Sequence, residues 1–491
     1  MENFYKILET SFKQHASNDC LRLENGQVWL YCDLLKTIEK LSAVLVLQGV
    51  RSGDRVVVQI EKCPENLALY LATLRVGAIY VPLNTAYTTS ELNYFLADAE
   101  PALFVGLQIM ENLASLTLTK DGEGTLIKAM LDKNLVIPNL CDRSNQDVAA
   151  IVYTSGTTGQ SKGAMLTHGN LASNAQALSD TWDWQPNDVL LHALPLFHVH
   201  GLFIASHCAL LNGTPIEFME TFDAERVQAA LTRCTVMMGV PTFYIRLLRL
   251  SKFSQQDMNH IRVFICGSAP LTEQVFREWE IVTGHRILER YGMSETIINT
   301  SNPLEGKRLP STVGFPLPGL DLRIADDQGQ TMPVGEVGMI EVAGPNVFSG
   351  YWRMPEKTKE EIRKDGFFIT GDLGTVDDEG RVAIVGRSKD LVISGGYNIY
   401  PKEVEYLIDE IPEVVESAVI GVYHPDLGEA VVAIIVPRYE KVNIDMVQLV
   451  LAGKIARFKQ PKKVINVEEL PRNVMGKVQK NLLRDRFSDL F

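Results

Sequence analysis

The first hundred residues alternate between helix-like and strand-like patterns of hydrophobic side chains. Residues 55–60 form a short apolar run typical of a buried strand, and residues 64–77 return to helical spacing. A helical pattern also covers residues 31–50, with apolar side chains at Leu34, Leu35, Ile38, Leu41, Val44 and Leu45. Strands that alternate with helices predict a largely parallel sheet covered on both faces.

Several later apolar runs end in glycine, proline, serine or histidine. The run at 189–194 leads into a segment with two histidines, the run at 235–240 ends at Pro241, and the run at 262–266 leads into Gly267 and Ser268. Ligands of open α/β sheets bind outside the carboxyl ends of the strands. We therefore expect a ligand site where these runs end.

The sequence changes character at about residue 312, where short alternating strands rich in glycine and proline begin. A last unit with its own strand and helix pattern starts near residue 388. A chain of 491 residues is too long for one core. We predict an α/β N-terminal domain (1–388) that includes a β subdomain (about 312–386), followed by a small, mobile α+β C-terminal domain (389–491).

A run of small polar residues directly follows the predicted buried strand at 149–153. Glycines let the backbone approach a ligand, hydroxyl groups and backbone N–H groups donate to oxygen, and a lysine adds positive charge. The run predicts a phosphate loop, although its composition also fits a flexible surface loop. It is not a Walker A site, because Ser161 stands where that motif needs its second glycine. The predicted phosphate-binding residues are Thr154, Ser155, Gly156, Thr157, Thr158, Gly159, Gln160, Ser161 and Lys162.

Charge and cysteine content narrow the class of protein. The net charge of −13 argues against general binding of nucleic acid or of a membrane surface. Seven scattered cysteines without a Cys-x-x-Cys pair favour inert thiols in a reducing compartment. Since the N-terminal residues have no signal or transit pattern, we expect a cytoplasmic protein.

Five motifs in one order resemble the adenylate-forming superfamily of acyl-CoA synthetases, nonribosomal adenylation domains and luciferases. They are the loop at 153–163 and the stretches at 290–296, 370–373, 386–390 and 471–477. Within the superfamily, the stretches at 192–203, 238–244, 287–293 and 346–353 are most similar to malonate–CoA ligases. One departure is Ser294, where the family usually has threonine. The resemblance implies ATP and CoA as co-substrates, Mg²⁺ as cofactor, and an acyl-adenylate intermediate.

The resemblance also implies roles for residues of the nucleotide site. Glu295 is expected to bind Mg²⁺, Asp372 and Arg387 to hold the ribose together with Tyr291 in the ATP site, and Lys477 to bridge the attacking carboxylate and the α-phosphate. Each residue also has a structural interpretation: a helix-start carboxylate for Glu295, a turn aspartate for Asp372, a surface ion pair for Arg387 and a solvated tail for Lys477.

A domain rotation is expected between the two half-reactions. Lys389 resembles the hinge residue of the family, and Gly395, Gly396 and Tyr397 resemble the loop that lines the path of the CoA thiol. Without the resemblance, the two glycines indicate only a turn.

The acid is predicted from the residues around the acyl pocket. A malonate pocket needs a cation for the second carboxylate, and Arg246 is the first candidate because arginine pairs with carboxylates in a bidentate manner. The other predicted substrate residues are Arg290 as the second cation, Ser268 as a hydrogen-bond donor, Val199 and Met293 near carbon 2 of the acid, and His198 facing the acyl group.

With Lys477 and Glu295, His198 completes the predicted catalytic set, although a satisfied core histidine is an alternative. Methylmalonate or another small carboxylate is the alternative substrate. A nucleotide-binding regulator without catalysis is disfavoured because the predicted catalytic residues are present. A free acyl carrier protein stays open as a partner.

Overall fold

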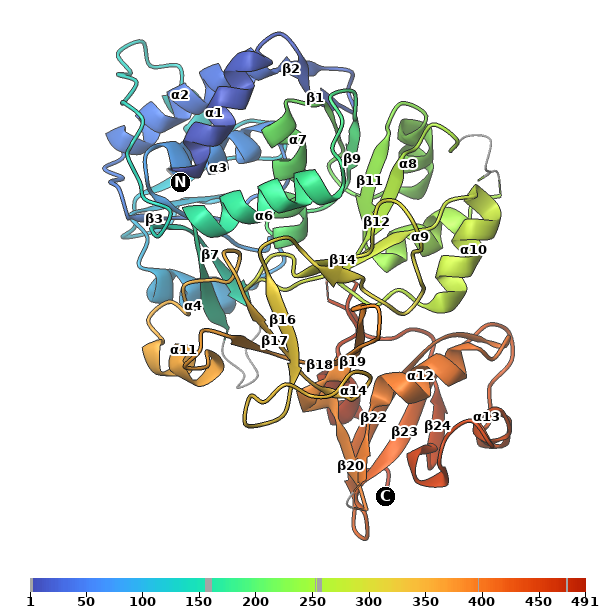
Figure 1. Cartoon of the computed structure of the whole chain (residues 1–491). Helices are drawn as coiled ribbons and strands as arrows, with labels where there is room; N and C mark the ends of the chain where they lie inside the picture. The colour runs from blue at the N-terminus through green and yellow to red at the C-terminus, as the bar shows by residue number, and fades with distance from the viewer. Residues whose placement is uncertain (1–2, 155–160, 252, 254–257, 396, 474–475) are drawn as a thin grey trace.

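The computed structural model describes residues 3–154, 161–251, 253, 258–395, 397–473 and 476–491. In these residues the chain forms an N-terminal region of two large sheets and a smaller β subdomain, followed by a separate C-terminal α+β domain (Figure 1). This arrangement confirms the predicted α/β class with a large N-terminal and a small C-terminal domain.

The first large sheet carries the predicted phosphate loop at one edge. All its neighbouring strands run parallel except the last pair, β7 and β8, which is antiparallel. In spatial order the strands are β6 (Ser115–Thr117), β5 (Leu103–Gly106), β3 (Arg55–Val58), β4 (Ile79–Pro82), β7 (Val148–Thr154) and β8 (Lys162–Thr167). The hairpin between β7 and β8 therefore brackets residues 155–160, the segment predicted to bind phosphate.

The second large sheet brings the carboxyl ends of four parallel strands to one edge. These strands are β9 (Leu190–His192), β11 (Val236–Gly239), β12 (Val263–Cys266) and β13 (Leu288–Tyr291). The sheet is completed on one side by β10 (Ile216–Phe218), β1 (Asp19–Leu23) and β2 (Val28–Leu30), and on the other by β14 (Thr300–Ser301) and β15 (Phe315–Pro316). The predicted strand ends thus meet at a shared edge, as expected for a ligand site.

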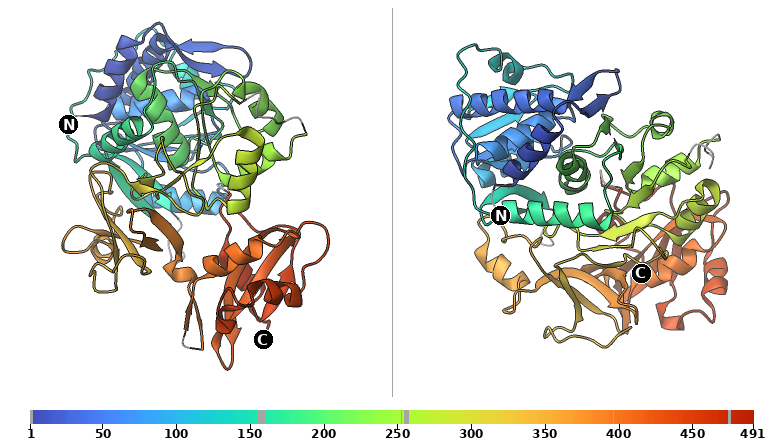
Figure 2. Two further views of the ribbon diagram at one scale, coloured as in Figure 1. Left: turned by 45° about the vertical axis from the view of Figure 1, so that its right-hand side comes forward. Right: turned by 45° about the horizontal axis from the view of Figure 1, so that its top comes forward.

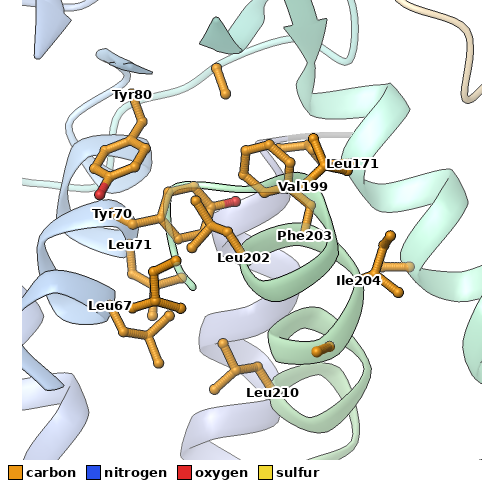
Figure 3. Close-up of a cluster of buried hydrophobic side chains, with 14 of the residues drawn as sticks. Leu67, Tyr70, Leu71, Tyr80, Leu171, Val199, Leu202, Phe203, Ile204 and Leu210 are labelled. Carbon is orange, nitrogen blue, oxygen red and sulfur yellow. The ribbon is translucent and has the colours of Figure 1, made fainter. Parts of the chain in front are cut away.

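Helices pack on these sheets through continuous apolar faces. Around α3, the residues Leu67, Tyr70 and Leu71 meet Leu202 and Phe203 of η1, a π-helical turn (Figure 3). The helices of this region are α1 (Phe4–Gln14), α2 (Tyr31–Leu47), α3 (Pro64–Arg75), α4 (Thr89–Ala99), α5 (Thr125–Ala129), α6 (His168–Thr181), η1 (His200–Ala205), α7 (Ser206–Asn212), α8 (Ala224–Leu231), α9 (Pro241–Leu248) and α10 (Glu273–Thr283).

The β subdomain is an antiparallel sheet that leads directly to the C-terminal domain. It contains β16 (Asp321–Ala325), β17 (Gly338–Ala343), β18 (Phe368–Val376) and β19 (Val382–Arg387), with α11 (Pro355–Glu361) beside it. One short turn, η3 (Ser388–Asp390), follows β19. Strand β18 packs against η3, so the chain leaves the N-terminal region at the end of β19, beside Asp372 in the middle of β18.

The C-terminal domain lies toward the lower right of both views, beside the β subdomain, and has its own core (Figure 2). Its sheet contains β21 (Tyr397–Ile399), β20 (Val392–Ser394), β23 (Gly428–Pro437) and β22 (Val414–His424), and β24 (Lys463–Asn466) pairs with β23. Its helices are α12 (Pro401–Asp409), α13 (Ile444–Leu451) and α14 (Lys480–Arg486). Helix α12 faces the N-terminal region, and the β20–β21 hairpin lies at the far end of the domain (Figure 1).

Candidate functional site

A cavity of about 250 Å³ lies between the N-terminal region and the C-terminal domain. Ser268 and Arg290 line it from the ends of β12 and β13, Asp372 and Arg387 from the β subdomain, and Lys477 from the C-terminal domain. Residues from three parts of the chain thus meet at the edge that the strand pattern predicted.

The two ends of the predicted phosphate loop are held by neighbouring elements. Thr154 ends β7, and the Tyr94 hydroxyl of α4 donates to the Ser161 carbonyl oxygen over 2.8 Å. The Tyr153 hydroxyl donates to Asp98 over 2.5 Å, which ties β7 to the same helix. The other predicted loop residues, Ser155, Gly156, Thr157, Thr158, Gly159 and Gln160, lie outside the described residues.

Glu295 is a buried carboxylate surrounded by hydroxyl groups. Its Oε1 accepts hydrogen bonds from Tyr351 over 3.1 Å and from Thr154 over 3.4 Å. Burial raises the pKa of Glu295. Hydrogen bonds from its own backbone N–H and from Tyr351, together with the positive charges of Lys162 and Arg387, offset that effect only in part. Glu295 forms no ion pair within the described residues, so its negative charge is available to a cation.

Lys162 occupies the opposite end of this hydroxyl network. Its Nζ lies 3.0 Å from Glu361 Oε1 and 4.1 Å from the centre of the Tyr351 ring. The Tyr351 hydroxyl lies 2.6 Å from Glu361, so it links the Lys162–Glu361 ion pair to Glu295. Lys162 was predicted to bind phosphate, whereas no site role was predicted for Tyr351 or Glu361. No sequence signal joined them, because Glu361 lies about 200 residues from Lys162 in the chain.

Asp372 is held between two partners in the β subdomain and the second sheet. Its Oδ1 lies 2.8 Å from Arg387 Nε, across the β18–β19 pair. Its Oδ2 accepts a hydrogen bond from the Tyr291 hydroxyl over 2.6 Å. The positive φ of Gly371 (73°) shapes the backbone immediately before it. The structure therefore brings together Tyr291, Asp372 and Arg387, which lie far apart in the sequence.

Lys477 reaches the same cavity from the C-terminal domain. The backbone N–H of Lys477 donates a hydrogen bond to Asn473 Oδ1 over 3.0 Å, and this bond holds the turn in place. Burial lowers the pKa of Lys477 to about 8, and the positive charge of Arg387 contributes to this shift. Lys477 and Arg387 are thus close enough to repel each other, and an anion between them would relieve that repulsion.

Arg290 is buried, and its guanidinium group forms no ion pair with a carboxylate of the described residues. Its side chain lies against Gly267, where a Cβ would come within 2.6 Å of the guanidinium carbon. The Nε and Nη2 atoms have no hydrogen-bond partner among the described residues, and burial lowers the pKa of Arg290 to about 10. An unpaired buried cation is costly, so the site is suited to an anionic ligand.

Two histidines stand beside Arg290. Burial, together with the positive charges of Arg290 and Lys477, lowers the pKa of His198 to about 4. His200 Nδ1 lies 3.1 Å from the Ser268 hydroxyl oxygen, and Ser268 has the unusual backbone angle φ of 71°. Burial also lowers the pKa of His200, so both histidines are neutral at pH 7. Ser268 and Arg290 line the cavity, whereas His198 lies close to Arg290 without lining it.

The structure changes the ranking of the two predicted substrate arginines. Arg246 is exposed on α9 and does not line the cavity, whereas Thr242 and Ile245 of the same helix do. Arg246 follows Thr242 by four residues and so lies on the same side of α9, but its side chain is exposed to solvent. Arg246 stays a predicted substrate residue, and Arg290 is the predicted arginine that lines the cavity.

Val199 and Met293 do not line the cavity either. Val199 is buried in the hydrophobic core beside Phe203 (Figure 3), and Met293 packs against the same core. Their place beside the acid therefore stays a prediction.

The predicted CoA loop lies away from the cavity. Gly395 and Tyr397 are exposed in the β20–β21 hairpin, Tyr397 stacks on Phe458 with ring centres 4.5 Å apart, and Gly396 lies outside the described residues. Lys389 is exposed in η3, at the connection between the two domains. In this conformation Lys477, not the hairpin, faces the cavity.

Two other kinds of feature are absent from the described residues. No cluster of three or more histidine, cysteine or acidic side chains suited to a metal occurs among them. None of their helices is long and apolar enough to cross a membrane.

Comparison with known proteins places the chain in a family. Residues 8–352 match the AMP-binding enzyme model, and residues 403–477 match the model for the AMP-binding enzyme C-terminal domain. Malonate–CoA ligase of Arabidopsis thaliana is 33% identical (98% of this chain, 88% of that protein), and feruloyl-CoA synthase of an Amycolatopsis species is 35% identical (94% of each).

A solved structure extends the comparison to the whole fold. ATP-bound MatB from Rhodopseudomonas palustris is 49% identical, with a TM-score of 0.95 over 99% of each chain. ATP and CoA are the co-substrates that fit such a fold. The chain belongs to the family of AMP-binding, adenylate-forming enzymes.

Proposed function

We propose that the protein joins malonate to coenzyme A in two steps, with ATP cleaved to AMP and pyrophosphate. The observation that carries the proposal is Arg290, whose buried guanidinium group forms no ion pair with a carboxylate of the described residues and lies in the same cavity as Lys477. One carboxylate of malonate reacts with ATP and the other needs a cation. Arg290 supplies that cation, and Ser268 and neutral His198 supply hydrogen bonds.

In the first step a malonate oxygen attacks the α-phosphorus of ATP, and pyrophosphate leaves. The two reactants are both anions, so the site must place positive charge between them. Lys477 bridges the attacking carboxylate and the α-phosphate, and the loop at 154–162 holds the leaving pyrophosphate. Asp372 accepts hydrogen bonds from the ribose hydroxyl groups, while Arg387 and Tyr291 hold the Asp372 carboxylate in place.

Glu295 is the proposed ligand of Mg²⁺. The carboxylate fits this role because its neighbours are hydroxyl groups and it forms no direct ion pair in the described part of the chain. Mg²⁺ prefers oxygen ligands and is commonly held by one or two carboxylates together with substrate phosphates. The ion would supply charge neutralisation on the ATP phosphates.

In the second step the CoA sulfur attacks the malonyl carbonyl carbon, the bond to phosphate breaks, and AMP leaves. Lys477 occupies the cavity in the present conformation, and the β20–β21 hairpin lies far from it. We propose that the domain 389–491 rotates against residues 1–388 about Lys389 and brings Gly395, Gly396 and Tyr397 to the adenylate. Domain closures of this kind depend on a few residues that absorb the dihedral change.

Similarity within the family supports the choice of malonate without deciding it. The Arabidopsis relative is a malonate–CoA ligase, but the Amycolatopsis relative of similar identity is a feruloyl-CoA synthase. A free acyl carrier protein is a further proposed acceptor. The seven free cysteines support a reducing compartment, for which we propose the cytoplasm.

A panel of acids tests the proposal. Purified protein with ATP, Mg²⁺, CoA and either malonate, methylmalonate, acetate or ferulate is assayed for AMP and thioester. Malonate is expected to exceed acetate by as much as ~10⁴-fold in kcat/KM, because acetate leaves Arg290 unpaired. One methyl group discriminates by only roughly 10–200-fold. Equal use of acetate and malonate would contradict the assignment.

Two arginine variants locate the second carboxylate. Arg290→Met is expected to remove the preference for malonate over acetate, whereas Arg246→Ala is expected to retain it. Arg246 is the matched control, since it is an arginine near the site that does not line the cavity. A lost preference in Arg246→Ala with an intact preference in Arg290→Met would reverse the assignment.

A further inference from the structure

A buried lysine joins the two large sheets just behind the acid-binding region. Lys62 follows β3 of the first sheet and is 7% exposed. Its Nζ lies 2.8 Å from His192 Nδ1 and 2.7 Å from the His192 carbonyl oxygen, at the end of β9 in the second sheet. It also lies 4.4 Å from the centre of the Phe218 ring. Lys62 has no carboxylate partner in the described residues, so these contacts replace an ion pair.

The contacts of His192 determine its tautomer. Its Nε2 lies 2.9 Å from the Gly201 carbonyl oxygen, which accepts hydrogen bonds only. Nε2 must therefore carry a proton. Burial and the neighbouring Lys62 lower the pKa of His192 well below its usual value, so the ring is neutral and Nδ1 has no proton. Nδ1 is then an acceptor, and Lys62 is its donor.

His192 in turn holds the first turn of η1. The Gly201 carbonyl oxygen also accepts from the Ser206 N–H, as a π-helical turn requires, and from the Ser206 hydroxyl over 2.8 Å. Gly201 cannot be replaced easily, because a Cβ there would lie 2.1 Å from the Pro195 carbonyl oxygen. The apolar side of η1 packs on α3, which begins two residues after Lys62 (Figure 3).

The same turn begins at one histidine of the site, His200, and is hydrogen-bonded to the other, His198. His200 Nδ1 contacts Ser268 over 3.1 Å, and the His200 N–H donates to His198 Nδ1 over 3.2 Å. The Leu202 N–H donates to the His198 carbonyl oxygen over 2.9 Å. A shift of Gly201 would thus displace His198 and His200 relative to Arg290.

We propose that Lys62 is a positioning residue for acid binding: it fixes the His192 ring, which fixes the π-helical turn that begins at His200 and is hydrogen-bonded to His198. The inference rests on the proposed function, because it assigns these histidines to the acid side of the site. Lys62 does not touch substrate. A misplacement of about 1 Å at a reacting group lowers rates by roughly 10²-fold, which sets the size of the expected effect.

The test is Lys62→Met, with Asn66→Ala as the matched control. Asn66 is also buried at this junction, where it bonds the Tyr80 hydroxyl, but it does not contact His192. In the malonate-dependent exchange of pyrophosphate into ATP, Lys62→Met is expected to lower kcat/KM for malonate about 10–100-fold and leave KM for ATP within about twofold. Asn66→Ala is expected to change neither. Equal losses in both variants, or no loss in Lys62→Met, would overturn the proposal.

A second measurement needs no substrate. In ¹⁵N NMR spectra the neutral His192 ring, assigned by comparison with His192→Gln, is expected to show a protonated Nε2 and a hydrogen-bonded, unprotonated Nδ1. In Lys62→Met the Nδ1 signal is expected to lose the shift that this hydrogen bond causes. An unchanged signal would overturn the proposal. Because no acid is added, a failure of the malonate assignment leaves this result readable.

His192→Gln also carries the test if Lys62→Met does not fold. The glutamine amide can still donate to the Gly201 carbonyl oxygen, whereas His192→Ala cannot. His192→Gln is expected to retain kcat/KM for malonate within about tenfold of the original protein, and His192→Ala to fall lower, by up to roughly 10²-fold. Equal activity of the two variants would contradict the chain of contacts from Lys62 to the site.

Discussion

Arg387 Nε lies 2.8 Å from Asp372 Oδ1, so two residues on neighbouring strands of the β subdomain form an ion pair in the lining of the cavity, with the carboxylate buried and the arginine partly exposed. The attraction of Asp372 raises the pKa of Arg387, which keeps the guanidinium group charged. The carboxylate retains lone pairs for further donors. The pair is therefore a fixed acceptor for two neighbouring hydroxyl groups, such as those of a ribose.

Replacing Asp372 tests that role. Asp372→Asn keeps the size of the side chain but removes the charge that Arg387 and the nucleotide hydroxyl groups use. Hydrogen bonds to charged groups contribute about 1.5–3 kcal/mol, so KM for ATP is expected to rise roughly 10–150-fold. Steady-state kinetics measure KM for ATP, and titration calorimetry with AMP measures the affinity for the nucleotide. Asp365→Asn, at an exposed ion pair with Arg323, is the control and is expected to be neutral. A similar KM in both variants would exclude the ribose role.

Lys477 is expected to act in only one of the two half-reactions. Lys477→Ala removes the cation between the carboxylate and the α-phosphate, and adenylate formation is expected to fall about 10²–10³-fold. Conversion of added malonyl-adenylate and CoA to thioester is expected to stay within a few-fold. Exchange assays and single-turnover thioester assays separate the two steps. An exposed C-terminal lysine, in Lys454→Ala, is the control, and an equal loss in both half-reactions would argue for general damage.

The pKa of Lys477 predicts the pH dependence of the first step. Its value of about 8 means that the cationic form predominates at pH 7 and is lost as the pH rises through 8. The kcat/KM for malonate in adenylate formation, which reports the free enzyme, is therefore expected to fall above about pH 8. Lys477→Arg is expected to remove this alkaline limb, because arginine stays protonated. An alkaline limb that persists in Lys477→Arg would assign the titration to another group.

Tyr351 is expected to support metal binding through Glu295. Tyr351→Phe removes the hydroxyl group that joins Glu295 to Glu361 and leaves the ring over Lys162. Loss of such a partner of a metal ligand commonly weakens binding 10–100-fold, and about tenfold is expected here. The affinity for Mn²⁺ is measured by titration in the presence of a non-hydrolysable ATP analogue, with electron paramagnetic resonance as the readout. Tyr423→Phe at an exposed tyrosine is the control; unchanged Mn²⁺ affinity in Tyr351→Phe would separate Tyr351 from the metal.

Local sequence patterns predicted much of the framework. The apolar run at 55–60 forms β3, and the run at 149–153 forms most of β7, because a continuous buried strand needs apolar side chains on both faces. The turn residues after 266 lead into Ser268, which lines the cavity. These features depend on neighbours in the chain, and periodicity reports them directly.

The sequence did not indicate which of the two predicted substrate arginines lines the cavity. Arg246 and Arg290 were both arginines near strand ends, and composition did not separate them. The fold separates the two arginines, because Arg290 lies near the end of a buried strand, whereas the Arg246 side chain is exposed on α9. Which face of a helix meets the cavity depends on how α9 packs between its neighbours, and that is a long-range property.

The sequence by itself determined the order of strands and helices, the location of a phosphate loop and the motifs that define the family. Only the tertiary structure decided which distant side chains meet. The tertiary structure pairs Lys162 with Glu361, bonds Lys62 to His192, and places Lys477 in the cavity beside Arg387. The physical reason is that hydrophobic periodicity is encoded within a few residues, whereas buried polar groups find partners from any part of the chain that folding brings within hydrogen-bonding distance.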